Sequence, residues 1–366
     1  MQLSVGIVGL PNVGKSTLFN ALTRSSVPAE NYPFCTIDPS VGVVAVPDPR
    51  LETLSKISGS EKIIPAIVEF VDIAGLVKGA ASGEGLGNKF LQNIREVSMI
   101  AEVVRIFEDG DIHHVAGMVD PMSDIEVINL ELIMADTETV SRRLSNVERD
   151  AKRGDKDSVK EKEVLEALLA HLQDGKLANS LDLSDDEKKL VKNLHLLTMK
   201  QFLYVCNRKQ DSFNLDEQND ERWQRLVEFF EETGSEYVVV DAGMEHDLKD
   251  LEEDEKTEFR REYGAQDSGV ESLIRACYHR LGLMSYFTTG EKETRAWTVE
   301  QGSTGPEAGS AIHTDFRDKY IRAQVVSFAD LVVAGSIPKA RETGKLRTEG
   351  KEYIVQDGDV IEFMHS

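Results

Sequence analysis

The stretch Gly9–Thr17, which reads Gly-Leu-Pro-Asn-Val-Gly-Lys-Ser-Thr, restricts what this chain can fold into more than any other segment. The short apolar run 3–8 before it predicts a buried strand, and residues 16–22 after it show the apolar spacing of a helix. Gly-x4-Gly-Lys-Ser between a strand and a helix is the phosphate-binding loop, in which backbone N–H groups and the helix N-terminus surround a phosphate. The alternative is a chance glycine-rich turn, which requires neither the lysine nor the serine. The sequence therefore predicts a nucleoside triphosphate site.

The side chains of this loop have distinct expected roles. Lys15 would reach the β- and γ-phosphates, which makes it a candidate catalytic residue, and the Ser16 hydroxyl would be a ligand of Mg²⁺. The candidate nucleotide-binding residues of the loop are Asn12, Val13, Gly14, Lys15, Ser16 and Thr17.

A second motif, Asp72-x-x-Gly75, ends the predicted strand 64–72. After a phosphate loop, this motif supplies a carboxylate that holds Mg²⁺ through a water and an N–H group, that of Gly75, that senses the γ-phosphate. Thr36, in the proline-punctuated loop 31–39, is the hydroxyl placed to complete the magnesium shell, with ordinary loop polarity as the alternative. The expected magnesium ligands are Ser16, Thr36 and, through water, Asp72.

Two features differ from an ordinary GTP-dependent switch. Leu76 follows Gly75 where Ras-like proteins carry the glutamine that positions the attacking water, and leucine cannot hydrogen-bond to water. After the predicted strand 202–206, the guanine-reading sequence Asn-Lys-x-Asp is replaced by Asn207-Arg208-Lys209-Gln210. Because Gln210 lacks the carboxylate that accepts two hydrogen bonds from guanine, the preference for guanine loses its main physical source. Asn207 and the main chain of Arg208 are the candidates for contacts with the base.

The composition excludes several classes of protein. The formal net charge of −23 argues against wrapping nucleic acid or binding an anionic membrane, although it leaves room for a local basic patch. The three cysteines are widely separated, which indicates free thiols in place of a disulfide framework or a zinc site. No run reaches the roughly 18 apolar residues of a membrane span, and the N-terminus enters a strand at once. We therefore expect a cytoplasmic protein.

The order of predicted elements indicates an α/β sheet with helices on both faces, interrupted by a helical insertion. Residues 125–199 are dense in Glu, Lys, Arg, Leu and Ala, and their apolar residues repeat at helical intervals with one break at 154–157. This pattern predicts an antiparallel helical hairpin or coiled coil. It is either a solvated helix pair or an arm that binds a partner, and the arm is favoured because so long an excursion is not needed to complete the sheet.

The last part of the chain differs again. From residue 283, short strand-like runs at 296–299, 320–326, 352–355 and 360–363 are separated by glycine turns. They predict a small α+β domain of about 80 residues, which is large enough to fold by itself. The expected domains are residues 1–128 and 200–282 for the two parts of the P-loop NTPase domain, 129–199 for the insertion and 283–366 for the C-terminal domain.

These motifs together resemble the YchF-type Obg-like ATPases. The matching segments are 9–20, 31–37, 48–51, 72–80, 83–90, 103–108 and 357–360. The resemblance extends over essentially the whole chain and implies a P-loop domain of the Obg group, a coiled-coil insertion and a C-terminal TGS domain. It also implies hydrolysis of ATP in preference to GTP, with Mg²⁺, and association with ribosomes. That family usually has Asn-x-x-Glu at the base site, so Gln210 departs from its pattern.

The group that positions water has two candidates in the polar loop after the predicted strand 103–107. His113 and His114 lie in this loop, and a neutral imidazole can orient or polarise a water. A loop histidine that merely bonds to the backbone is the alternative. Because one histidine is usual at this place in the family, the resemblance favours His114 as the catalytic residue.

Three functions remain open on the sequence. The first is a nucleotide-switched ATPase that acts on the translation machinery, and the second is a GTPase of the Obg group. The third is a nucleic-acid-binding module with vestigial hydrolysis, for which the last domain has a basic run of Lys339, Arg341, Lys345, Arg347 and Lys351. A solvated charged loop explains this run equally well. We expect a monomer that contacts the ribosome or ribosomal RNA through its TGS and helical regions.

Overall fold

The computed structural model describes residues 3–24, 40–73, 88–110, 112, 117–248, 251, 255–256, 258–259 and 268–365. These residues form two compact units. The first unit contains the described residues of 3–24, 40–42 and 69–273, and the second contains 43–68 and 274–365.

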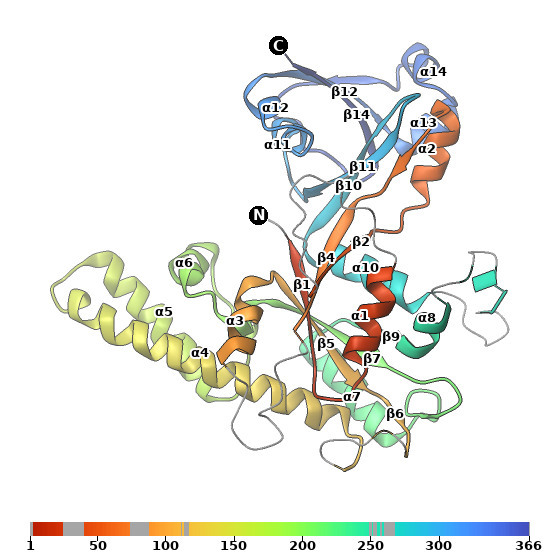
Figure 1. Ribbon diagram of the computed structural model, residues 1–366. Helices are drawn as coiled ribbons and strands as arrows, with labels where there is room; N and C mark the ends of the chain where they lie inside the picture. Colours follow the sequence, from red (N-terminus) through yellow and green to blue (C-terminus); the bar gives the residue numbers. More distant parts are fainter. Residues whose placement is uncertain are drawn as a thin grey trace. The chain divides into compact units, whose positions relative to one another are not determined.

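The first unit is built on a six-stranded sheet in the order β2-β4-β1-β5-β7-β9 (Figure 1). Its strands are β1 (Ser4–Val8), β2 (Val41–Ala45), β4 (Ile67–Asp72), β5 (Met99–Arg105), β7 (Gln201–Asn207) and β9 (Tyr237–Val240). Strand β1 pairs in parallel with β4 and β5, β5 with β7, and β7 with β9. All residues of β1 and β5 are buried, as expected for central strands of a parallel sheet that is covered on both faces.

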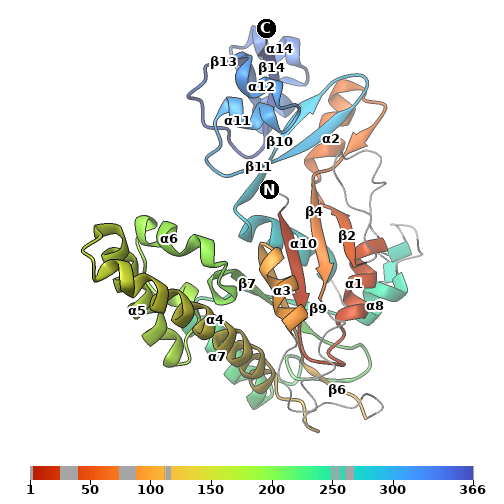
Figure 2. The ribbon, with the colours of Figure 1, turned by 60° about the vertical axis from the view of Figure 1, so that its left-hand side comes forward.

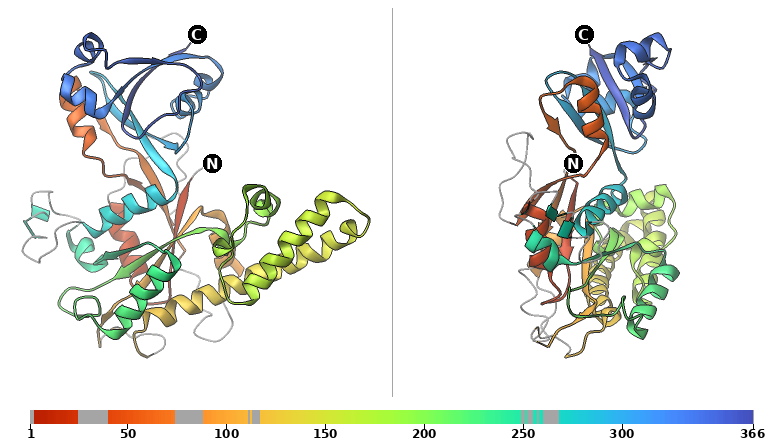
Figure 3. Two further views of the ribbon diagram at one scale, coloured as in Figure 1. Left: turned by 180° about the vertical axis from the view of Figure 1, so that it is seen from behind. Right: turned by 90° about the vertical axis from the view of Figure 1, so that its right-hand side faces the viewer.

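Helices cover both faces of this sheet, which confirms the predicted fold class. Figure 3 shows α1 and α8 on one side and α4 and α7 on the other. The helices around the sheet are α1 (Lys15–Arg24), α3 (Asn88–Glu96), α7 (Glu221–Thr233), α8 (Ala242–Leu248) and α10 (Gly269–Arg280). A two-stranded sheet of β6 (Phe107–Glu108) and β8 (Phe213–Asn214) completes the unit. Two of the cysteines, Cys206 and Cys277, are free and buried, whereas Cys35 lies outside the described residues.

The helical insertion is an antiparallel hairpin, as the apolar period predicts. Helix α4 (Pro121–Ala151) starts at the N-cap Asp120, and α5 (Lys156–Gln173) starts at the N-cap Asp155 after a turn at Gly154. Apolar residues of both helices pack into one core, which leaves the polar faces to solvent. Helix α4 begins before residue 129, and its first turns are buried against the main sheet. The hairpin is therefore a continuous extension of the first unit.

Short helices lead the chain from the hairpin back to the sheet. They are the 3-10 helix η4 (Ala178–Ser180), α6 (Asp185–Val191) and the 3-10 helices η5 (Lys192–Leu194) and η6 (Leu197–Met199). Helix α6 packs beside α5 (Figure 2). The buried carboxylate of Asp136 on α4 accepts hydrogen bonds from the N–H groups of Leu197 and Thr198 at 2.9 and 2.7 Å. These bonds fix the returning chain at the point where β7 begins.

The second unit has a mixed six-stranded sheet in the order β13-β12-β14-β10-β11-β3. Its strands are β3 (Ile63–Ile64), β10 (Leu283–Thr289), β11 (Thr294–Glu300), β12 (Tyr320–Ser327), β13 (Arg347–Glu349) and β14 (Asp359–His365). Its short helices are α11 (Gly305–Ser310), α12 (Asp315–Asp318), α13 (Phe328–Ala334) and α14 (Ile337–Glu342). The strand expected at 352–355 is not formed, because Tyr353 and Val355 turn inward to the core and only Ile354 makes an isolated bridge, to Thr304.

The segment 43–68 belongs to the second unit, although the sequence analysis places it in the first part of the P-loop domain. It contains α2 (Arg50–Ser58), which packs on β10, β11 and α13, and strand β3, which pairs with β11. The hydroxyl of Ser60 donates to the carbonyl of Gly290 at 2.7 Å. None of these partners is close in sequence, so the local sequence pattern could not show that the segment belongs to the second unit.

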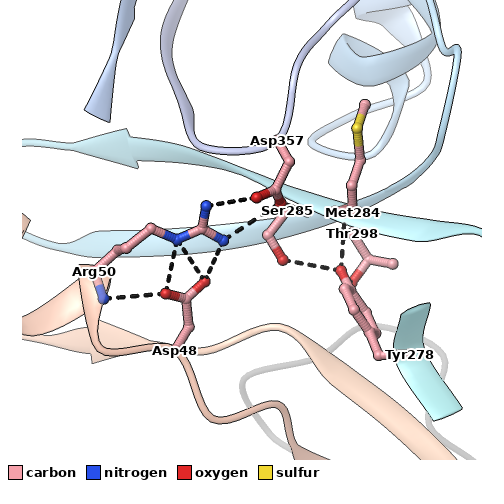
Figure 4. Close-up of polar contacts among 7 residues, drawn as sticks. All are labelled: Asp48, Arg50, Tyr278, Met284, Ser285, Thr298 and Asp357. Carbon is pink, nitrogen blue, oxygen red and sulfur yellow. Dashed lines mark hydrogen bonds and ion pairs between the residues drawn. The ribbon is translucent and has the colours of Figure 1, made fainter. Parts of the chain in front are cut away.

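Arg50 is the main polar anchor of this segment (Figure 4). Its guanidinium forms a two-bond contact with Asp48, at 2.9 and 2.7 Å, and also contacts Asp357 at 2.6 Å. It lies over the ring of Phe287 at 4.9 Å from the centroid. Asp357 in turn accepts a hydrogen bond from the N–H of Ser285 at 3.1 Å. The segment is thus held to the C-terminal strands by charge-assisted hydrogen bonds.

Candidate nucleotide-binding site

The phosphate loop connects β1 to α1 and has a backbone that few residue types can adopt. Gly9, Asn12 and Gly14 have φ angles of +153°, +64° and +100°. A Cβ atom at Gly9 would lie 2.4 Å from the carbonyl oxygen of Val103, and one at Gly14 would lie 2.2 Å from the amide nitrogen of Asn207. The two glycines are therefore required both by conformation and by the close approach of β5 and β7.

Lys15 is the first residue of α1, and its side chain is only 7% exposed. Its ammonium donates a hydrogen bond to the carbonyl of Leu10 within the loop. Burial lowers the Lys15 pKa to about 8, and the nearby Asp72 carboxylate opposes this shift. A buried ammonium with one carbonyl partner is well suited to receive phosphate oxygens, which would supply the missing negative charge.

Asp72 and Ser16 carry the kind of oxygen ligands that magnesium prefers. Asp72 ends β4 beside Ile7 of β1, and its N–H donates to Ser40 at 2.8 Å. Ser16 lies in the first turn of α1 with its side chain exposed. Among the residues that the structure describes, no cluster of three His, Cys, Asp or Glu side chains could hold a metal. Such a site would therefore depend on phosphate oxygens and waters, as magnesium sites of this kind do.

Asn207 joins three elements at the carboxyl edge of the sheet. Its side chain is 4% exposed, donates to the carbonyl of Val13 at 2.8 Å and accepts from the N–H of Ala242 at 3.1 Å. It thus links the phosphate loop, the end of β7 and the start of α8. These two bonds let the side chain fix the shape of the site, and the amide keeps a second N–H donor and a second acceptor lone pair.

Asp241 is a residue of this region that the sequence reasoning missed. It follows β9, is 5% exposed and accepts hydrogen bonds from the N–H groups of Gln210, at 2.6 Å, and Met244, at 2.8 Å. Burial raises the Asp241 pKa, while these two bonds oppose the shift. The signal available in the sequence was its position directly after a strand, one residue beyond the strand-end position of Asp72 and Asn207. Asp241 holds the segment 208–210 against the start of α8.

The remaining contacts fix the base-side segment further. Arg208 donates its N–H to Val240 at 2.9 Å, so this main-chain group is not available to a base, and its guanidinium pairs with Glu217 at 3.3 Å. Lys209 pairs with Asp109. These partners are remote in sequence or lie in an irregular loop, which is why spacing alone did not identify them.

The other expected site residues are Thr36, Gly75 and His114, and all of them lie outside the described residues, as do Leu76 and His113. The structure describes the chain before the two histidines through residue 110 and again at Ile112. Arg105, which is 1% exposed, donates to the carbonyls of Phe107, Ile112 and Asp109 at 2.9, 3.0 and 3.3 Å. This one guanidinium therefore sets the path of the loop after β5.

Two family models match the chain. Residues 4–134 match a model described as "50S ribosome-binding GTPase", and residues 283–366 match YchF-GTPase_C, described as "Protein of unknown function (DUF933)". The described part of the chain contains no helix long and apolar enough to cross a membrane.

Full-length relatives are similar over nearly the whole chain. The protein named "Ribosome-binding ATPase YchF" from Bacillus subtilis (strain 168) is 51% identical over 363 residues, covering 99% of both chains. Its namesake from Escherichia coli O157:H7 is 49% identical over 100% of this chain and 99% of its own. A solved structure of the Schizosaccharomyces pombe YchF GTPase superposes with a TM-score of 0.90 at 34% identity, covering 99% of this chain and 98% of that one.

Proposed function

Since this chain belongs to the YchF family, we propose that it is a magnesium-dependent nucleoside triphosphatase that prefers ATP and associates with the ribosome in the cytoplasm. The ribosome association and the hydrolysis are taken from the names of the relatives. These relatives match nearly the whole chain, in agreement with the resemblance inferred from the motifs. The observation that carries the proposal is the phosphate loop, whose Gly14 packs so closely on Asn207 that no other residue type fits.

The residues of this loop would act by position and charge. The N–H groups of the loop and the N-terminus of α1 would hold the phosphates, and the buried Lys15 ammonium would move its hydrogen bond from Leu10 to a phosphate oxygen. Ser16 and, through water, Asp72 and Thr36 would hold Mg²⁺, with Gly75 sensing the γ-phosphate. When bound, the ion would neutralise charge that develops on the phosphates.

The preference for ATP is supported by the chemistry of Gln210. An amide offers an acceptor and a donor side by side, which matches the amino group and ring nitrogen of adenine, whereas guanine presents two adjacent donors. The names of the relatives differ on this point, since the bacterial proteins are called ATPases and the yeast structure is called a GTPase. A GTPase of the Obg group is therefore the second candidate.

One titration separates these candidates. The purified chain with Mg²⁺ should bind and hydrolyse ATP better than GTP, and Gln210→Asp should move the ratio toward GTP by restoring a carboxylate acceptor. Lys15→Ala should bring the turnover of both nucleotides to background, as expected for a phosphoryl-transfer site. A wild-type preference for GTP would establish the second candidate. Absence of any turnover by the chain alone would favour a binding module with vestigial hydrolysis.

We assign the water-orienting role to His114. His114→Ala should lower kcat by ~10²–10⁴-fold with little change in ATP affinity, because the contact forms only in the transition state. His113→Ala is the matched control and should have a mild effect. Equal rates for the two variants would exclude His114 from this role.

A further inference from the structure

A groove of about 520 Å³ lies in the first unit, between the helices that follow the hairpin and the start of two strands. Ser98 and Gln201, which precede or begin β5 and β7, lie on one side of it. The rest is lined by four lysines, a histidine, an asparagine and four apolar residues, and no carboxylate is among the lining residues. The lysines and the histidine are Lys188, Lys189, Lys192, His195 and Lys200. We refer to it as the lysine groove.

The lysine groove lies away from the candidate nucleotide site. In the parallel sheet, the phosphate loop follows the carboxyl end of β1, and Asp72 and Asn207 are the last residues of β4 and β7. Ser98 and Gln201 are at the amino ends of β5 and β7, which run in parallel in register from Met99 and Gln201. The groove is therefore at the opposite edge of the sheet, and strand β7 runs from it to Asn207.

Positive charge in the lysine groove is only partly neutralised within the protein. Lys189 pairs with Asp186 at 2.8 Å, but no ion pair is described for the exposed Lys188 and Lys192 in the part of the chain covered by the structure. The ammonium of the half-buried Lys200 donates to the carbonyl of Arg95 at 3.2 Å. Burial and the charge of Arg95 both lower the Lys200 pKa. Cations are thus crowded at this edge of a chain whose net charge is −23.

His195 is held at the groove in an unusual backbone conformation. Its φ angle is +48°, in the left-handed region that non-glycine residues seldom adopt. Its carbonyl accepts a hydrogen bond from the guanidinium of Arg95 at 3.1 Å, which fixes this turn while leaving the imidazole exposed. The groove is therefore a shaped surface and not merely a set of mobile lysines.

We propose that the lysine groove binds the phosphate backbone of ribosomal RNA. The inference rests on the proposed association with the ribosome and names the surface that makes the contact. No Phe, Tyr or Trp side chain lines the groove, so it lacks the large stacking platforms that hold unpaired bases. Contacts limited to phosphates give binding that is independent of sequence and sensitive to salt.

Two of the five cations in the basic run of the C-terminal domain are less suited to this contact. Lys345 pairs with Asp330 at 3.0 Å, and Arg347 lies near the carboxylates of Glu349 and Asp359 at 3.6 and 3.9 Å. Cations that already have acidic partners release fewer counterions from RNA than free ones. This difference is why we place the RNA contact at the lysine groove.

The test compares three double variants in co-sedimentation with purified ribosomes across a salt series. Lys188→Gln/Lys192→Gln alters the lysine groove, and Lys345→Gln/Arg347→Gln alters the basic run. Lys152→Gln/Arg153→Gln is the matched control, because it removes the same charge from the hairpin tip, where these cations pair with Glu148 and Asp150. Unchanged circular dichroism and tryptophan fluorescence verify that each variant is folded.

The groove variant should bind more weakly than the other two, and its plot of log affinity against log salt should be shallower by about 1.5, as expected for two lost phosphate contacts. If the groove variant matches the Lys152/Arg153 control, the lysine groove is not the RNA site. If the unaltered chain does not sediment with ribosomes at all, the proposed ribosome association itself fails.

A second arm identifies the chemistry of the occupant without ribosomes. Labelled poly(U) RNA should bind the unaltered chain and lose affinity for the groove variant, whereas poly-glutamate at equal charge should compete poorly. Competition by poly-glutamate as effective as that by RNA would overturn the RNA assignment in favour of an acidic protein partner.

Discussion

At the scale of single residues, the most unusual group outside the nucleotide site is Glu102 in the middle of β5. Its side chain is fully buried, and neither carboxylate oxygen has a hydrogen-bond partner among the described residues. Burial raises the Glu102 pKa well above 4.5, and the charge of the neighbouring Asp124 on α4 adds to the shift. Burial, together with the charge of this carboxyl group, raises the pKa of Tyr204 on the adjacent β7. At a pH where this group would ionise in the unfolded chain, it must stay protonated in the folded chain, and this requirement destabilises the folded state.

This residue predicts how stability depends on pH. Below pH 4.5 the carboxyl group is protonated in both states, and above it the unfolded chain loses the proton first. The free energy of unfolding should therefore fall by about 1.4 kcal/mol per pH unit until the raised pKa of the folded state is reached. Glu102→Gln cannot ionise and should lack this contribution. Urea unfolding of both proteins at several pH values measures the difference.

Glu126→Gln, an exposed change on α4, is the control and should follow the wild type. Parallel pH profiles for wild type and Glu102→Gln would mean that the buried carboxyl group is neutralised by another partner.

At the scale of elements, α2 and β3 show how a segment can leave the sheet that its sequence neighbours build. Strands β2 and β4 both belong to the first sheet, and the chain between them packs on the C-terminal strands. Arg50 contributes its two-bond contact with Asp48, its contact with Asp357 and its position over Phe287. The side chain of Asp357 is 53% exposed, so solvent weakens that pair, and Asp48, at 10%, is the stronger partner.

We expect Arg50→Ala to destabilise the second unit by roughly 1–3 kcal/mol, since it leaves a half-buried carboxylate without its partner. Arg50→Lys should lower the stability of the second unit by an intermediate amount, because an ammonium keeps the charge but lacks the planar set of donors of a guanidinium. Fluorescence of Trp297 on β11, in a Trp223→Phe background, measures this transition because the chain has two tryptophans.

Lys319→Ala serves as the comparison within the same unit. Its pair with Asp315 is about half exposed, so the change should have little effect on the free energy of unfolding. A loss for Arg50→Ala no larger than this would show that α2 is held by apolar packing alone.

At the scale of the whole molecule, the chain has separate cores that nucleotide binding should affect unequally. The candidate nucleotide site lies in the first unit, and the second unit has its own core of strands β10, β11, β12 and β14. The two tryptophans report on them separately, because Trp223 lies on α7 and packs on Tyr237, whereas Trp297 lies on β11.

A non-hydrolysable ATP analogue with Mg²⁺ at about 100 times its Kd should stabilise the unit that binds it by roughly 2.7 kcal/mol. In single-tryptophan variants, the unfolding transition reported by Trp223 should move to higher denaturant, while the one reported by Trp297 stays in place. Lys15→Ala should abolish the movement. Equal movement of both transitions would mean that the two units unfold as one.

The sequence by itself determined the features whose physics is local. The phosphate loop is readable because Gly9 and Gly14 are required by backbone geometry within a few residues of the lysine they position. The helical hairpin is readable because its apolar period, its two N-caps and its turn all lie within one continuous stretch. Parallel strands are readable as short buried runs, which is why the fold class, the family resemblance and the order of elements agreed with the structure.

Only the tertiary structure decided the features that depend on distant partners. Asn207 contacts Val13 across a separation of 194 residues, and Arg50 contacts Asp357 across 307. In neither pair does the local sequence around one residue indicate its partner. Asp241 became part of the site, and 43–68 became part of the second unit, through such contacts. The lysine groove likewise combines strand starts with helices far along the chain. A periodic pattern specifies which face of an element is buried, but only the tertiary structure determines which other elements pack against that face.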